Sequence, residues 1–171
     1  MHNKINRYSL YAVLIVAFLI QLLFLDYVKI MGAKPDLLVI LVIFFAVFFG
    51  PGIGAEAGFA AGLFKDAYSL DIFGVNIILL SLTGVIAGLL GPKLFKESKL
   101  TQGLLVFVLS VLYMIIHYFV SSRILKITYV TLSEYLYGLI LPSSLYTAIL
   151  SIIIFPILIS RYRLKESTEY L

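Results

Sequence analysis

Cysteine and tryptophan are absent from this chain of 171 residues, and histidine occurs only at His2 and His117. The lack of cysteine excludes disulfides, thiol catalysis and thiolate metal ligands, and two histidines are too few for a histidine-based metal cluster. Charge is also scarce, because 13% of the residues are charged against roughly 25% in a typical soluble domain. We therefore expect no enzymatic chemistry, no metal and no cofactor.

Apolar residues dominate what remains. They make up 62% of the chain and its mean hydropathy is +1.09, which indicates an integral membrane protein. A helix needs about 20 such residues to cross a hydrocarbon core of roughly 30 Å. The apolar runs cover residues 9–25, 36–49, 52–64, 72–91, 100–120 and 136–160. They predict an all-α membrane protein with one domain over residues 1–171 and six transmembrane helices.

The second and third runs are short and are separated by Gly50-Pro51-Gly52. A proline disfavours helix at the residue before it and is well tolerated as a first helical residue. Pro51 is therefore predicted to end one helix and open the next. The two segments either cross the membrane separately or form a re-entrant hairpin whose turn is buried in protein.

The distribution of lysine and arginine predicts how the chain is oriented in the membrane. With six spans and a cytoplasmic N-terminus, eight of the 13 basic residues lie inside, whereas fusing residues 36–64 into one span leaves only five inside. Cytoplasmic loops are enriched in these residues, so we expect six spans with both termini in the cytoplasm. The inside set is Lys4, Arg7, Lys93, Lys96, Lys99, Arg161, Arg163 and Lys165. Topology thereby explains the net charge of +4, and we expect no nucleic-acid partner.

Glycines recur at four-residue intervals around the third run. They are Gly50, Gly54, Gly58 and Gly62, followed at the same spacing by Asp66, and the fourth run holds a second pair, Gly84 and Gly88. Small residues four apart let membrane helices approach closely, and glycine costs about 1 kcal/mol relative to alanine inside a helix. We predict that this glycine ladder packs against another helix, either within the bundle or from a partner.

Three polar side chains are predicted at one depth near the outer surface. The second helix begins at Asp36, the third ends at Asp66, and the fourth begins near Asn76. Ionisable groups in transmembrane segments are functional candidates, although Asp36 could simply cap its helix. Because an anion at a helix C-terminus is disfavoured, Asp66 is expected to bond across to Asn76 or Lys65, and Asp66→Asn is expected to be tolerated.

Two other ionisable side chains have structural interpretations. Glu56 lies near the cytoplasmic end of the third run and is interpreted as a solvated interfacial carboxylate. His117 follows Tyr113 by one turn and is interpreted as a packed, hydrogen-bonded histidine rather than a catalytic one.

A longer pattern extends from Pro35 to Gly91. Its members are Pro35-Asp36-Leu37-Leu38, Phe44-Phe45-Ala46, Gly50-Pro51, Gly54, Gly58-Phe59, Gly62-Leu63, Asp66, Ser69, Gly74-Val75-Asn76, Gly84 and Gly88. In order and spacing these residues resemble the MreD family of bacterial rod shape-determining proteins. The resemblance implies a compact six-helix bundle, similar to the substrate-binding subunits of energy-coupling-factor transporters. It also implies a non-catalytic protein of the bacterial inner membrane that acts with MreC, and indirectly with the MreB filament and wall-synthesis enzymes. The protein could be a homo-oligomer within such a complex.

Two functions from different classes remain open. The favoured one is an interaction protein that holds a partner's transmembrane helix, because the glycine ladder occurs without catalytic residues. The alternative is a substrate-binding subunit of a small-molecule, vitamin-type transporter, with Asp36, Asp66 and Asn76 lining its pocket. A polar vitamin needs several convergent hydrogen-bonding groups, and the sequence offers few at membrane depth, so we rank this alternative second.

Overall fold

The computed structural model describes residues 6–24, 27, 29, 32–69, 72–94, 99–125 and 131–162, and the regular elements in this part of the chain are all helices. They are α1 (Arg7–Leu23), α2 (Leu37–Phe49), α3 (Pro51–Tyr68), α4 (Val75–Leu94), α5 (Lys99–Leu125), α6 (Leu132–Tyr135), the π-helical segment η1 (Leu136–Ile140) and α7 (Leu141–Arg161). Because α6, η1 and α7 follow one another without a break, the described residues form six helical segments, as the sequence predicts. Four residues of the predicted inside set, Lys4, Lys96, Arg163 and Lys165, lie outside the described part.

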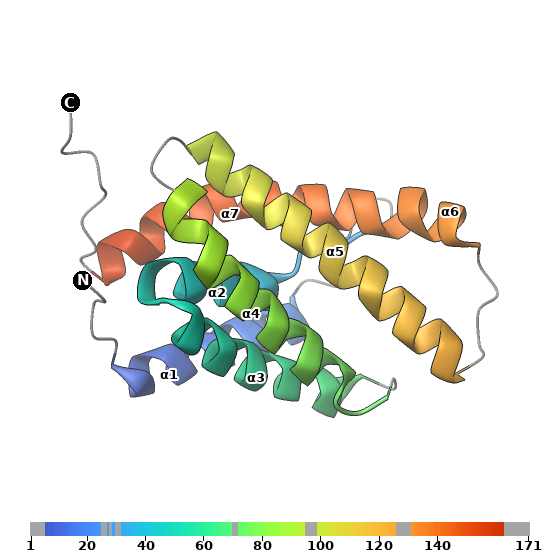
Figure 1. Ribbon diagram of the computed structural model, residues 1–171, viewed down its shortest axis with the longest axis horizontal. Coiled ribbons are helices and arrows are strands. Elements are labelled where there is room, and N and C mark those ends of the chain that lie inside the picture. The colour runs from blue at the N-terminus through green and yellow to red at the C-terminus, as the bar shows by residue number, and fades with distance from the viewer. Residues whose placement is uncertain are drawn as a thin grey trace.

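Helix α2 is the centre of the molecule. Twelve of its 13 residues are buried, which is typical of a helix that is apolar on every side. In Figure 1, α2, α3 and α4 lie together, with α1 along one edge and α5 and α7 along the other. Phe44 at the heart of α2 packs against Phe155 of α7, with ring centroids 5.4 Å apart. This contact ties the C-terminal helix to the core.

The predicted break at Pro51 is present. Helix α2 ends at Phe49, and α3 begins at Pro51. Gly50 between them has a φ of +95°, a backbone conformation that residues other than glycine rarely adopt. Gly50 is therefore a turn residue, which corrects its interpretation as a helical rung of the ladder.

The longest helices lie at the C-terminal end. Among the described residues, two helical stretches, Leu100–Arg123 and Leu132–Arg161, are long and apolar enough to span a membrane, and Arg7–Leu23, Leu37–Phe49 and Val75–Leu90 are shorter apolar helices. Helix α2, with 13 residues, is about 20 Å long at 1.5 Å per residue. It is shorter than a hydrocarbon core of roughly 30 Å.

The start of α1 and the end of α7 meet at one end of the bundle. The Ser9 hydroxyl and the Tyr162 hydroxyl are 3.1 Å apart. Glu56 of α3 also contacts the start of α1: it accepts a hydrogen bond of 2.6 Å from the Tyr11 hydroxyl and lies 3.6 Å from the Arg7 guanidinium. Glu56 is therefore a bonded carboxylate with a side chain 23% exposed, rather than a freely solvated one.

Candidate functional site

The glycine ladder of α3 lies directly against α4. A Cβ added at Gly54 would be 2.5 Å from the Gly84 carbonyl oxygen, and one at Gly62 would be 2.6 Å from the Asn76 carbonyl oxygen. One added at Gly58 would overlap the Leu80 carbonyl group. Residue numbers fall along α4 as they rise along α3, so the two helices are antiparallel and in backbone contact. We call this contact the glycine seam.

Gly84 and Gly88 supply the opposite side of the seam. An added Cβ at Gly84 would overlap the Gly54 carbonyl group, and one at Gly88 would be 2.5 Å from the Pro51 Cα. Helix α2 also reaches the seam, because the Ala46 Cβ is only 2.5 Å from the position that a Gly54 Cβ would take. The face of the ladder is therefore filled by the protein's own helices, which leaves no room there for the helix of a partner.

Asp66 lies just beyond the seam and caps α4. Its carboxylate accepts hydrogen bonds from the backbone N–H groups of Gly74 (2.9 Å), Asn76 (3.1 Å) and Ile77 (3.1 Å). It also accepts one from the Asn76 amide, at 2.8 Å. The predicted bond to Asn76 is present, but the reason differs from the one the sequence suggested. Although Asp66 is near the end of its own helix, it lies at the N-terminus of the next one, where negative charge is favourable.

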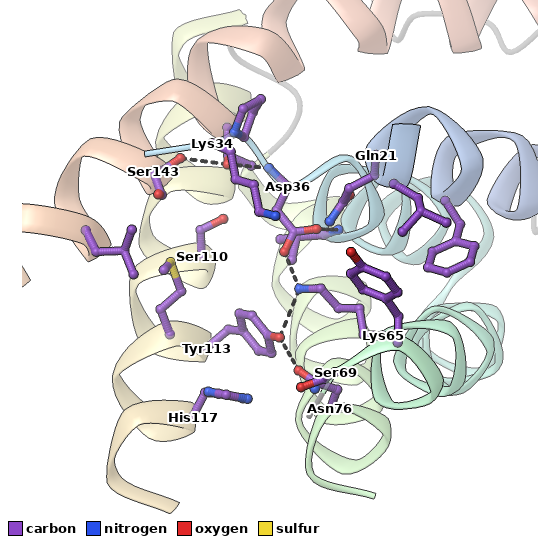
Figure 2. A pocket seen from close by; sticks show the side chains of 18 of the residues that line it. Gln21, Lys34, Asp36, Lys65, Ser69, Asn76, Ser110, Tyr113, His117 and Ser143 are labelled. Atoms are coloured by element: carbon purple, nitrogen blue, oxygen red, sulfur yellow. Dashed lines mark hydrogen bonds and ion pairs between the residues drawn. The ribbon is translucent and has the colours of Figure 1, made fainter. Parts of the chain in front are cut away.

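Asp36 caps α2 and also binds a lysine. Its carboxylate accepts from the Val39 N–H at 3.2 Å and forms an ion pair with Lys65. Lys65 donates a second hydrogen bond, of 3.0 Å, to the Tyr113 hydroxyl, which in turn donates to Asn76. Figure 2 shows these interactions as one chain from Asp36 to Asn76. The three predicted polar residues are thus joined, with Lys65 and Tyr113 as the links.

Removing the central lysine tests the importance of this chain. Lys65→Met should destabilise the protein by ~1–3 kcal/mol, because the Asp36 carboxylate and the Tyr113 hydroxyl each lose a donor in a half-buried setting. The measurement is the thermal unfolding midpoint of the purified protein in detergent. Adding Asp36→Asn should restore part of the loss, since asparagine still caps α2 and carries no charge. An unchanged midpoint for Lys65→Met would contradict this interpretation.

The chain of polar residues borders a cavity of about 760 Å³. Helices α1 to α7, the π-helical segment η1 and the segment before α2 all contribute to its wall. The polar lining residues are Gln21, Lys34, Asp36, Lys65, Tyr68, Ser69, Asn76, Ser110, Tyr113, Tyr135, His117, Ser143 and Thr147. The cavity brings together more polar groups than the sequence analysis anticipated for one site, because they come from many separate segments.

His117 lies in this wall on α5. Its ring is 6.0 Å from the Tyr113 ring, measured between centroids, which fits the predicted packing of the two side chains. Among the described residues, no group of three or more histidine, aspartate or glutamate side chains could hold a metal ion.

Gln21 is a site residue that sequence reasoning missed. Its Oε1 accepts from the backbone N–H groups of Leu37 (3.0 Å) and Leu38 (3.4 Å), and so satisfies the first turn of α2 from another helix. Thr147 of α7 likewise accepts from the Asp36 N–H at 3.0 Å. Gln21 and Thr147 are polar residues inside apolar runs. That position was the only feature of the sequence that could have indicated a hydrogen bond to another helix.

Comparison with known proteins gives one clear result. A family model described as rod shape-determining protein MreD matches residues 2–165. The match extends well beyond the Pro35 to Gly91 pattern and covers nearly the whole chain. Neither the curated proteins nor the solved structures gave a significant match.

Proposed function

Since the chain belongs to the MreD family of rod shape-determining proteins, we propose that it binds MreC and thereby helps to couple the MreB filament to peptidoglycan synthesis. Family membership makes it a non-catalytic membrane component of the cell-elongation machinery. The observation that carries the proposal is the family match over residues 2–165. The glycine seam supports it, because backbone-to-backbone packing provides a rigid core on which a partner can be held.

The partner helix binds an outward face of the bundle in this proposal. The ladder is filled by α4, whereas large apolar side chains on α1, α3, α5 and α7 point outward. On α5 they recur every four residues, and on α3 they lie outside the seam. The exposed residues that follow these two patterns are Leu100, Leu104, Val108, Leu112 and Ile116 on α5, with Phe59 and Leu63 on α3. In a bilayer such side chains contact either lipid or another membrane helix.

Both termini are cytoplasmic in this proposal. The basic residues favour that orientation. The contact between the Ser9 and Tyr162 hydroxyls also places the start of α1 and the end of α7 at the same end of the bundle. The cavity is lined by the end of α1 and the starts of α2 and α7, so it then lies at the periplasmic end of the bundle. A likeness to the substrate-binding subunits of energy-coupling-factor transporters remains a proposal that no matched structure supports.

Co-purification tests the partnership. The tagged protein, extracted from the native membranes of a rod-shaped bacterium in mild detergent, should retain MreC in near-stoichiometric amount. An unrelated multi-pass protein with the same tag is the control. If MreC is absent from the purified material while the bait is folded and abundant, the proposed partnership is wrong.

A further inference from the structure

The cavity beside the polar chain has the size and wall of a ligand site. Its volume of about 760 Å³ lies within the roughly 300–1,000 Å³ of pockets that enclose drug-sized molecules. One part of its wall is apolar or aromatic, with Phe18, Leu22 and Met114, and another is polar. Figure 2 shows the polar side chains converging from separate helices.

The acceptor groups at the cavity are already in use. Both oxygens of Asp36 accept hydrogen bonds, one from the Val39 N–H and one from Lys65. The side-chain amide oxygen of Asn76, Oδ1, accepts from the Tyr113 hydroxyl. Thr147 accepts from the Asp36 N–H and donates to the Ser143 carbonyl oxygen, at 3.0 and 2.7 Å. The carboxylate of Asp36 and the side-chain amide oxygen of Asn76 are therefore already occupied.

Donor groups, in contrast, remain available. Ser110 is 3% exposed, and its hydroxyl has no hydrogen-bond partner among the described residues. A buried hydroxyl without a partner is costly unless something accepts from it. Gln21 uses its Oε1 for Leu37 and Leu38, and its amide N–H groups take no part in those bonds. Two of the three Lys65 ammonium protons are taken by Asp36 and Tyr113.

The wall also contains a cation that can reach an anion. The Lys65 ammonium has a third proton beyond the two that Asp36 and Tyr113 accept. Lysine is a common binder of phosphate groups.

The wall also contains an irregular backbone segment. The π-helical η1, whose Leu139 lines the cavity, closes with a bond from the Leu141 N–H to the Leu136 carbonyl. Pro142 follows at once, and proline disturbs the helical bond to the residue four positions before it. Single π turns are frequent at functional sites.

We propose that this cavity binds a phosphate-bearing anion with an apolar part, held by Lys65, Gln21 and the hydroxyls of Ser110 and Ser143, two buried serines that both line it. A lipid with an anionic headgroup and a soluble phosphorylated molecule share this chemistry. The site is independent of the partnership with MreC, so either proposal can fail without the other.

The test uses the purified full-length protein in detergent, titrated with short-chain phosphatidylglycerol, short-chain phosphatidylcholine and inorganic phosphate. Binding is read by native mass spectrometry and by the shift in thermal unfolding. We expect one saturable phosphatidylglycerol site that binds phosphatidylcholine more weakly. The variant Ser110→Ala/Ser143→Ala should bind phosphatidylglycerol at least about tenfold more weakly, because two donors to a charged acceptor are lost.

Ser121→Ala is the matched control. Ser121 is on the same helix as Ser110, and its hydroxyl also has no partner among the described residues, but Ser121 does not line the cavity. Its affinity should equal that of the unmodified protein. Binding of inorganic phosphate that competes with phosphatidylglycerol and is lost in the double variant would support a soluble ligand. Equal binding by the double variant and Ser121→Ala, equal affinity for phosphatidylcholine, or no saturable binding of any probe would overturn the proposal.

Discussion

Gly58→Leu is expected to abolish accumulation of the folded protein. Gly58 is at the middle of the glycine seam, where even a Cβ would overlap the Leu80 carbonyl group of α4. Backbone atoms cannot move aside as the end of a flexible side chain can, so the two helices must separate. Overpacking a core typically costs 1–3 kcal/mol, occasionally more, and a leucine in a backbone contact belongs at or above the upper end. The measurement is the amount of protein in the membrane, together with rod shape in a strain depleted of the native copy.

Gly52→Ala is the matched control for this experiment. Gly52 is on the same helix, and a Cβ there would have no heavy atom within 4 Å. Alanine at such a position should be neutral or stabilising by about 0.4–1 kcal/mol. Gly58→Ala should already reduce the amount of folded protein. Normal levels and normal cell shape with Gly58→Leu would show that the seam is not required for folding.

Asp66→Leu is expected to destabilise the protein by at least about 4 kcal/mol, because four hydrogen-bond donors lose their acceptor in a buried setting. The Asp66 side chain is 4% exposed, and the donors it accepts from include the N–H groups of Gly74 and Ile77. The measurement is the thermal unfolding midpoint in detergent, with Glu56→Gln as control. Glu56 also binds across helices but accepts from the Tyr11 hydroxyl at an exposed position, so its substitution should have a small effect.

Asp66→Asn should also be harmful, which reverses the expectation from the sequence. Each carboxylate oxygen faces two donors, so an asparagine must direct its own N–H₂ at one of these pairs. A loss of about 2 kcal/mol follows from leaving such groups unsatisfied. If Asp66→Asn unfolded at the same temperature as the unmodified protein, the carboxylate would not be the cap that the geometry indicates.

Local features of the fold could be predicted from the sequence because each depends on a few neighbouring residues. Pro51 marks the end of α2 and the start of α3 since proline acts on the residue before it. The four-residue interval from Gly54 to Gly62 predicts one packed helix face for the same local reason. Gly50 shares that interval by coincidence, and only its backbone conformation shows that it forms the turn.

The candidate site could be predicted only in part, since its contacts join distant segments. Asp66 and Asn76 are ten residues apart and could be placed together from topology. The ion pair of Asp36 with Lys65, the link through Tyr113 and the cap from Gln21 depend on how helices rotate against one another. No interval in the sequence encodes that rotation, so the cavity they surround could not be foreseen.

The central claim is that this protein holds a partner on an outward face while its glycine seam stays internal. Site-specific photocross-linking in living cells tests this claim most directly. Probes at Phe59 and Leu63 on the outer side of α3, and at Leu104 and Leu112 on α5, sample exposed positions. Probes at Ala57 and Ala61 of α3, both fully buried, sample the interior. We expect adducts with MreC from one set of outward positions and none from the buried pair. Adducts with MreC from probes at Ala57 or Ala61, in protein that accumulates normally, would contradict the claim that the seam is internal.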